Sequence, residues 1–290
     1  RYFCLSRGLG DVYKRQVFKE WASRFKERGV RVIDANILGD DRAFEEMEFG
    51  RGWEWDDLVY GYAAPVNALQ FNENVVTIEI APGARPGDSA SIKVVPLPGY
   101  LSVDSRVITG AAGTEAEIEV ERGKGEESVV LKGSVLLGSG PVSRAVAVGS
   151  PTLYYLAALK FTLASEGIEV SKCAIRRLSK SAATPTGPLT PLWVHTSPPL
   201  SEILKPLLKV SQNLYAETVT KTLGLVLRQE GSFAMGKEVV EDTLRRMAIE
   251  KGTYSYADGS GLSRLNLISA DLLVRIFKYM YRRKEFTPFY

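Results

Sequence analysis

The sequence is poor in the side chains that metal and redox chemistry require. Its 290 residues include only 2 cysteines, Cys4 and Cys173, and 1 histidine, His195. These counts exclude a Cys/His zinc cluster and a paired-cysteine redox motif, and they allow at most one histidine-based triad. His195 lies in the alternating segment PLWVHTSPP, which we interpret as a strand carrying a structural histidine. A hydrolase with this sequence would therefore use another base, and we expect no cofactor and no metal.

Long apolar runs, internal repeats and low-complexity tracts are also missing. No run approaches the roughly 20 apolar residues of a membrane helix, so we expect no transmembrane segment in this chain. The net charge is +3 without a long basic run, which gives no reason to expect nucleic acid as a partner. An anionic small substrate remains compatible with this charge.

The composition is that of a folded protein with more than one domain, since 45% of the residues are hydrophobic and 24% are charged. Residues 1–16, RYFCLSRGLGDVYKRQ, show neither helical nor strand periodicity and resemble a translated adaptor sequence. We set them apart as a non-native leader, together with Cys4. Cys173 is then expected to be unpaired.

Two kinds of periodicity divide the rest of the chain. Residues 17–29 and 152–167 repeat apolar side chains at helical spacing, and each stretch ends at a glycine. Residues 75–148 contain short alternating runs separated by Gly and Pro, which predicts a small and mostly antiparallel β unit. We expect a further strand within 30–41. The Ser/Thr/Pro-rich stretch 179–191 is the best candidate for a domain boundary.

Aromatic and acidic side chains gather in the irregular segment 49–76, which we name the aromatic segment. Its residues of this kind include Trp53, Trp55, Asp56, Asp57, Tyr60 and Tyr62. Aromatic rings beside carboxylates suit the wall of a site for a polar ligand. A tightly packed loop is the structural alternative.

The trio Ser211-Gln212-Asn213 interrupts two apolar helical stripes, which we expect to be buried. The stripe residues are Leu200, Ile203, Leu204, Leu207 and Leu208 before the trio and Leu214, Val219, Leu223, Val226 and Leu227 after it. Unpaired polar groups withdrawn from water cost roughly 1–3 kcal/mol, so the trio either has fixed partners or lines a cleft where a ligand supplies them. A simple helix junction with Ser211 as N-cap also explains the trio when it is taken alone. Farther on, we expect a helix near 237–252 and a last helix that Ser269 caps.

Three motifs in this order resemble the penicillin-binding protein type 4 family. They are GWEWDD with YAAPVNAL in the aromatic segment, Ser211-Gln212-Asn213 followed by LYAE, and DGSGLSR at 258–264. Members of that family are serine D-alanyl-D-alanine carboxypeptidases and endopeptidases of the bacterial envelope. The resemblance covers residues 17–290, and it implies a location in the periplasm or cell envelope.

Enzymes of this kind carry three catalytic motifs, Ser-x-x-Lys with the nucleophile, Ser-x-Asn, and Lys-Thr-Gly. The resemblance implies that Ser211 relays a proton between nucleophile and leaving group, and that Asn213 holds the substrate's amide. It also implies a pocket for the charged end of the peptide side chain, lined by Asp57, Tyr62 and Arg264. An acid suits an ammonium and a guanidinium suits a carboxylate, while an interior salt bridge is the structural alternative for Arg264.

The first and third catalytic motifs have no good match in this sequence. Ser23-Arg24-Phe25-Lys26 has the nucleophile spacing, but it lies on the wet face of a predicted helix, where nothing makes the lysine a neutral base. Lys221-Thr222-Leu223 lacks the glycine and lies within a predicted helix. We therefore expect a fragment of a serine-type carboxypeptidase that neither hydrolyses D-Ala-D-Ala peptides nor acylates with penicillin. Peptidoglycan stem peptides and β-lactams would be partners of the intact parent.

We expect a multidomain α/β fold. Its parts are a leader at 1–16, an inserted mixed α/β domain at 17–72 and 147–187, a nested β domain at 73–146, and a partial transpeptidase or β-lactamase-like domain, mainly its helical part, at 188–290. The segment around Asp57 must then fold back over the cleft. Two alternatives remain, a non-catalytic peptidoglycan-binding or scaffolding protein of the same fold, and a related esterase or β-lactamase, which the large insertion disfavours.

Overall fold

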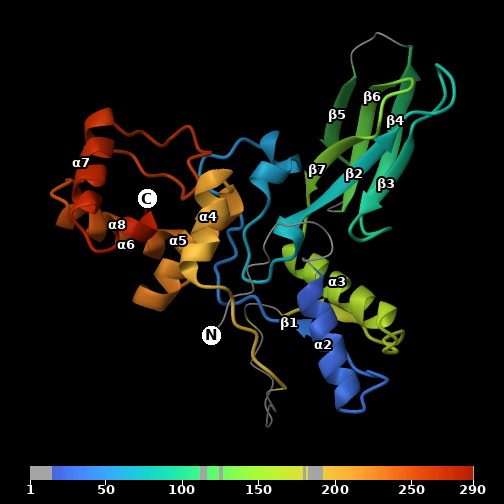
Figure 1. The fold of residues 1–290 in the computed structure, drawn as a ribbon, viewed down its shortest axis with the longest axis horizontal. Coiled ribbons are helices and arrows are strands. Elements are labelled where there is room, and N and C mark those ends of the chain that lie inside the picture. The colour runs from blue at the N-terminus through green and yellow to red at the C-terminus, as the bar shows by residue number, and fades with distance from the viewer. Residues whose placement is uncertain (1–14, 112–115, 124–126, 179–180, 182–191, 290) are drawn as a thin grey trace.

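The chain has a mixed α/β fold in which strands and most helices are separated in space (Figure 1). The computed structural model describes residues 15–111, 116–123, 127–178, 181 and 192–289. Helices in these residues are α2 (Gln16–Glu27), α3 (Pro151–Ser165), α4 (Leu200–Lys209), α5 (Asn213–Arg228), α6 (Phe233–Arg246), α7 (Ala270–Tyr281) and α8 (Phe286–Phe289). Figure 1 shows the main sheets at the upper right, α2 and α3 beneath them, and α4 to α8 on the other side of the molecule.

Within the described ranges the strands form two three-stranded sheets and one short pair. They are β1 (Ile37–Gly39), β2 (Val75–Ala81), β3 (Ser91–Val95), β4 (Ser102–Gly110), β5 (Glu117–Arg122), β6 (Ser128–Leu136), β7 (Val142–Ala147) and β8 (Ile175–Arg177). One sheet has the antiparallel order β3-β2-β7, and the other has the order β4-β6-β5. In the second sheet β5 and β6 are antiparallel, whereas β4 and β6 are parallel. The prediction of short, mostly antiparallel strands is confirmed, with the pair β4–β6 as its exception.

One large hydrophobic core joins these sheets to α2 and α3. In β2 the alternating residues Val76, Ile78 and Ile80 are fully buried, as the period of two requires of a strand with one face in the core. Helix α3 begins at Pro151, where a missing backbone N–H costs nothing, and it is apolar on nearly every side. Phe18 of α2 packs against Tyr155 of α3, with ring centroids 4.9 Å apart. The helices predicted for 17–29 and 152–167 are thus confirmed.

The helical side has its own, much smaller core of Val66, Ile203, Leu214 and Tyr215. The expected helices are present there, and Ser269 caps α7 by accepting the backbone N–H of Leu272. The helix expected near 237–252 is α6, which begins earlier and ends at Arg246. Its start is set by Ser232, whose hydroxyl accepts the N–H of Met235.

The expectation of two buried stripes around the trio is wrong at four of their residues. Leu200 and Leu208 of α4 and Val226 and Leu227 of α5 are each more than half exposed. Helical spacing shows that these residues share a face, but it does not supply a neighbour to cover that face. Among the described residues no helix combines the length and apolarity needed to cross a bilayer.

The strand predicted around His195 is also absent, because residues 192–199 pair with no strand in the described parts of the chain. Instead the segment runs as an extended strap over α2. Trp193 packs edge-on against Phe25 at 4.8 Å, and His195 contacts Trp21. The alternation therefore reflects packing against a helix, not a β ladder.

The strand expected within 30–41 is limited to β1, which pairs in parallel with β8. Val32 forms only an isolated bridge with Glu169 and is about half exposed. The expected boundary at 179–191 lies outside the described residues except for Ser181.

Candidate active site

The trio forms the corner between α4 and α5. Ser211 has a φ of 54°, in the left-handed region that residues other than glycine seldom occupy. Gln212, not Ser211, is the N-cap of α5, because its side-chain oxygen accepts the N–H of Leu214 at 3.0 Å. The Ser211 hydroxyl is thus not the N-cap of α5, and Ser211 is exposed. A strained residue that its neighbours hold in place is a candidate for function.

The corner borders a cavity of about 410 Å³ between α5, the aromatic segment and β7. Its lining includes Tyr60, Tyr62, Glu73, Arg144, Ser211, Gln212 and Asn213. Three of the five residues expected at the site, Ser211, Asn213 and Tyr62, therefore face one space. Asp57 and Arg264 are not among the residues that line it.

Two hydrogen bonds attach the trio to the aromatic segment. Asn213 donates from Nδ2 to the carbonyl oxygen of Tyr62 at 2.9 Å, and Gln212 donates from Nε2 to a carboxylate oxygen of Glu73 at 2.8 Å. These bonds join residues 139 to 151 positions apart in the sequence. The return of this segment to the α4–α5 corner, which the sequence interpretation required, is present in the structure.

Asp57 reaches the cavity through Tyr62. The Tyr62 hydroxyl donates to Oδ1 of Asp57 at 2.6 Å, and this hydrogen bond raises the pKa of Tyr62 to about 12. The phenol therefore stays protonated at neutral pH. The two side chains form one hydrogen-bonded unit in which Tyr62 lines the cavity, and the Asp57 carboxylate suits a cationic ligand group.

Arg264 lies apart from this cavity. Its side chain is 82% exposed and forms an ion pair with Glu54 at 3.1 Å. This ion pair lies at the surface. The alternative expected from the sequence, an interior salt bridge, is therefore wrong. Glu54 is part of the aromatic segment, and Arg264 therefore contacts the segment that carries Tyr62 without reaching the corner.

Asp258 organises the loop that carries Arg264. Its buried carboxylate accepts hydrogen bonds from the backbone N–H groups of Gly261 and Ser263, both at 2.7 Å, and from the amide of Asn266. It also accepts the indole N–H of Trp53 at 2.8 Å. Sequence reasoning noted this residue only as part of a motif. An Asp followed by Gly-Ser-Gly is a turn signal that predicts such side-chain to backbone bonding.

Glu217 on α5 is a second buried carboxylate that sequence reasoning missed. Its Oε1 accepts the N–H of Gly259 at 2.8 Å and that of Ser260 at 2.9 Å. Burial, and next the charge of Asp258, raise the pKa of Glu217 to about 7. A glutamate in the helical pattern LYAETV gives no signal of this role, because glutamate is common on exposed helix faces.

Lys221 is a second buried ionic residue of α5. It donates to the carbonyl of Met47 and forms an ion pair with Glu45 at 3.4 Å. Burial lowers the pKa of Lys221. Its place within a helix agrees with the prediction that Lys221-Thr222-Leu223 is no Lys-Thr-Gly motif, because that motif belongs to an edge strand.

The Ser-x-x-Lys match on α2 lacks the geometry of a nucleophile and its base. Ser23 is exposed and donates to Glu27 at 3.2 Å. Lys26 is about one-third exposed and forms an ion pair with Glu166 at 3.3 Å. Each side chain has a different acidic partner, so nothing here generates a neutral lysine beside a serine hydroxyl.

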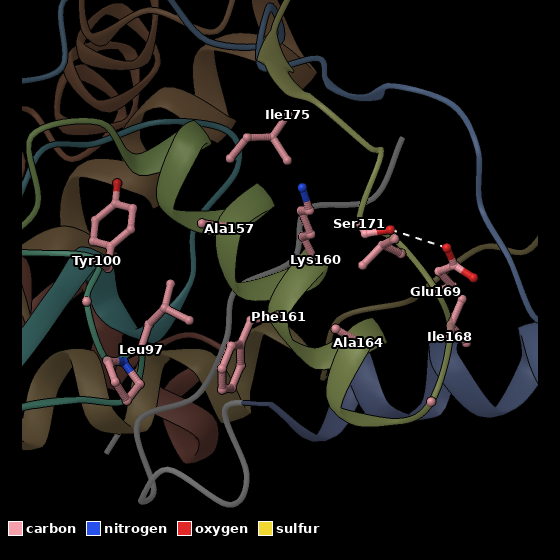
Figure 2. Close-up of a pocket in the computed structure, with 14 residues that line it drawn as sticks. Leu97, Tyr100, Ala157, Lys160, Phe161, Ala164, Ile168, Glu169, Ser171 and Ile175 are labelled. Atoms are coloured by element: carbon pink, nitrogen blue, oxygen red, sulfur yellow. Dashed lines mark hydrogen bonds between the residues drawn. The ribbon is translucent and has the colours of Figure 1, made fainter.

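A larger cavity, of about 770 Å³, lies elsewhere, along α3 (Figure 2). Figure 2 shows Leu97 and Tyr100 on one side of α3 and Glu169 and Ser171 on the other. Its walls are mainly apolar, and it shares no residue with the cavity at Ser211. In the described residues no cluster of His, Cys, Asp or Glu could hold a metal ion.

The chain is similar to known proteins over most of its length. The chain is 30% identical over 276 residues to a D-alanyl-D-alanine carboxypeptidase of an Actinomadura species, covering 92% of this chain and 50% of that protein. It is 24% identical over 280 residues to the D-alanyl-D-alanine carboxypeptidase DacB of Haemophilus influenzae, covering 96% of this chain and 57% of that protein. The chain thus spans about half the length of these relatives.

The crystal structure of penicillin binding protein 4 (dacB) from Haemophilus influenzae superposes with a TM-score of 0.78 at 24% identity, over 95% of this chain and 59% of that one. A second structure of that protein, complexed with a novel β-lactam, superposes with a TM-score of 0.69 at 21% identity. At these identities the two likenesses show the fold. Residues 5–290 match the family described as D-Ala-D-Ala carboxypeptidase 3 (S13), a range that includes part of the stretch set apart as a leader. The chain belongs to this family of D-Ala-D-Ala carboxypeptidases.

Proposed function

We propose that this chain supplies the Ser-x-Asn wall of a serine-type D-Ala-D-Ala carboxypeptidase or endopeptidase that acts on peptidoglycan stem peptides. One observation carries the proposal. Ser211, in a strained backbone conformation, and Asn213 line the same cavity as Tyr62, although Tyr62 comes from a segment some 150 residues away in sequence. Helix packing and the Gln212 cap hold the corner in place before any substrate arrives, which is what positioning requires.

The reaction that we assign to the complete enzyme proceeds through an acyl-enzyme. A serine oxygen attacks the carbonyl carbon of the penultimate D-alanine, the C–N bond breaks, and the terminal D-alanine leaves after its nitrogen gains a proton. Water then hydrolyses the ester and restores the serine. Ser211 would carry the proton to the leaving nitrogen. The amide of Asn213, which donates to the Tyr62 carbonyl in this structure, would hold the amide of the substrate.

The substrate's charged side-chain end would meet the aromatic segment. Asp57 with Tyr62 would receive an ammonium group, since Asp57 offers a carboxylate bonded to Tyr62, which lines the cavity. Arg264 would receive a carboxylate. Its present partner Glu54 is exposed and surface ion pairs are weak, so exchange of one carboxylate for another costs little.

The domain division follows the same assignment. Residues 17–72 and 147–187 would be an inserted mixed α/β domain, 73–146 a β domain nested in it, and 188–290 the helical part of a transpeptidase-like domain. One hydrophobic core is shared by residues of 17–72, 73–146 and 147–187, whereas the helical part has a smaller core that also includes Val66, and this difference supports only the boundary near 188. In Figure 1, α4 to α8 lie apart from the sheets, α2 and α3, which supports the same boundary. The family supports a location in the cell envelope.

We further propose that this chain does not catalyse the reaction itself. The one Ser-x-x-Lys match, at Ser23, lacks the geometry described above, and the sequence contains no Lys-Thr-Gly. A non-catalytic protein that binds peptidoglycan through the same cavity is the second candidate, and the same two observations favour it. A longer reading frame with Ser-x-x-Lys and Lys-Thr-Gly in its flanks would support the enzyme.

Binding of a stem peptide tests the proposed site. A peptide ending in D-Ala-D-Ala is titrated into the isotope-labelled chain, and amide resonances are followed by NMR. We expect shifts at Ser211, Asn213 and Tyr62, and roughly tenfold weaker binding by Asn213→Ala, the equivalent of one hydrogen bond. Ser211→Gly suits the left-handed backbone and removes the hydroxyl together with Cβ, and Ser23→Ala is the control. Shifts confined to other regions, or unchanged affinity in Asn213→Ala, would contradict the assignment.

A further inference from the structure

The three elements proposed to form the substrate site meet at two buried carboxylates. Helix α5 carries Asn213, the aromatic segment carries Tyr62, and the loop 257–266 carries Arg264. Asp258 binds the indole N–H of Trp53 in the aromatic segment and at the same time closes its own loop through backbone N–H groups. One carboxylate therefore joins two of the three elements.

Glu217 joins the third element to them. It lies four residues after Asn213, so both side chains leave the same face of α5. Its Oε1 binds two consecutive N–H groups of the loop, those of Gly259 and Ser260. The helix and the loop are in close contact at this point, because a Cβ added to Gly259 would lie 2.5 Å from Oγ1 of Thr220 and 3.0 Å from the carbonyl oxygen of Ala216. Glycine is required for this approach.

We propose that Glu217 is a positioning residue that acts with Asp258 as a joint, holding α5, the loop 257–266 and the aromatic segment in fixed relative positions. The joint does not touch substrate. It acts through the residues that the three elements carry, Asn213, Tyr62 and Arg264. Its relevance to substrate rests on the proposed function, whereas the joint itself rests only on the contacts described.

Both carboxylates of the joint are buried, which makes their hydrogen bonds costly to break. Glu217 and Asp258 are each 1% exposed, so their hydrogen bonds are shielded from water in the intact structure. Removing one carboxylate leaves buried N–H groups unsatisfied, and the elements then separate or admit water. Buried polar contacts of this kind specify one arrangement, where apolar contacts would allow several.

Protonation is expected to change the joint near neutral pH. Burial raises the pKa of Glu217 to about 7, and the titratable groups that act on it are Asp258 and Tyr256 on the loop side and Lys221 one turn farther along α5. An ionised carboxylate accepts N–H bonds more strongly than a neutral acid does. Both forms are therefore populated at neutral pH, and the two loop bonds differ in strength between them.

A substrate-free NMR titration of the full chain tests the joint. The backbone amides of Gly259 and Ser260, the indole N–H of Trp53 and the side-chain amide of Asn213 are followed from pH 5.5 to 8.5. We expect all four to titrate with one shared midpoint near 7, because they report on one coupled unit. Glu217→Gln removes this transition. Glu241→Gln, a buried glutamate of α6 that pairs with Lys237 and Lys251, leaves it intact.

Two results would overturn the proposal. Either the loop amides do not titrate in this range, or they titrate while Trp53 and Asn213 do not, which would make Glu217 a local cap of the loop only. Both results come from the wild-type protein, so the outcome does not depend on whether the variant folds. Because no substrate is present, a failure here leaves the proposed substrate site untouched, and a failure of peptide binding leaves the joint untouched.

Discussion

The two sides of this molecule are held together in different ways. The sheets, α2 and α3 share one continuous apolar core, in which residues such as Ile78, Val129 and Leu156 are almost fully buried. In the described part of the chain, the core cluster on the helical side contains only four buried residues. Large apolar side chains stay exposed there, namely Leu200, Leu208, Val210, Val226, Leu227, Leu265, Leu267, Ile268, Leu273, Val274, Phe277, Tyr281 and Phe289.

On the helical side, buried polar contacts hold the elements together, as the apolar core does on the other side. Glu217 and Lys221 each bind backbone groups of another element, and Asp258 accepts the indole N–H of Trp53 in the aromatic segment. Gln70 of the aromatic segment donates to Thr218 of α5 at 2.8 Å, well away from water. Such contacts add little net stability, but they tolerate few alternative geometries. The candidate site lies where positions are set by directional bonds.

The largest expected difference between the two sides concerns apolar truncation. Ile78→Ala should lower the free energy of unfolding by about 2–5 kcal/mol, because it leaves a cavity in a closed core. Leu273→Ala on the exposed face of α7 should change it by no more than about 0.5 kcal/mol. Denaturant unfolding monitored by circular dichroism measures both. Equal losses would mean that the exposed face is covered in solution.

The second effect is a pH dependence that arises on the helical side. The pKa of Glu217 is higher in the folded than in the unfolded chain, so its protonation stabilises the fold. This contribution is complete below the unfolded pKa and is lost as the pH rises through about 7, with a size of up to about 3 kcal/mol. Glu217→Gln should remove this slope from unfolding curves measured at pH 5 and pH 8. A slope identical to that of the wild type would contradict the role of burial at this residue.

A smaller loss is expected from the contact between Trp53 and Asp258. Trp53→Phe keeps an aromatic ring but removes the indole N–H that the buried carboxylate accepts. A hydrogen bond to a charged group contributes about 1.5–3 kcal/mol, so a loss in this range is expected by chemical denaturation. Trp55→Phe is a suitable control, because the Trp55 side chain is exposed. The prediction fails if the two substitutions have the same effect.

The smallest effect is expected at Arg264. Because its ion pair with Glu54 lies at the surface, Arg264→Ala should alter the free energy of unfolding by less than about 1 kcal/mol. Under the proposed function it should nevertheless weaken binding of a stem peptide that carries a side-chain carboxylate. Calorimetry with that peptide and with its amide separates the two effects. A large loss of stability would show that the residue is structural.

The sequence predicted most of the elements but not how far they are buried. The period of two in β2 and the helical spacing of α3 were sufficient, because both elements enter the large core where pattern and burial coincide. The strap at His195 has the same alternation as a strand, and only the contact with Trp21 shows that it packs on a helix. Val226 follows the helical period equally well and is exposed, since periodicity carries no information about a covering partner.

Prediction of the candidate site was limited in the same way, because local sequence pattern does not show which residues another element covers. The interrupted apolar stripe and the aromatic and acidic composition drew attention to the trio and to the segment of Tyr62, but the resemblance to the family assigned Ser211, Asn213 and Tyr62 to a site. Glu217 was missed because a glutamate at a helical position looks solvated until the loop 257–266 is placed over it. Whether such a glutamate is buried depends on long-range contacts, which the local sequence pattern does not predict.

The central claim is that this chain carries the Ser-x-Asn wall of the site without a nucleophile of its own. It is tested most directly by incubating the purified chain with a fluorescent penicillin, beside an intact member of the family, and analysing both by gel and by mass spectrometry. We predict that the family member is labelled and that no serine of this chain forms a covalent adduct. An adduct at Ser23, or at any other serine, would contradict the account.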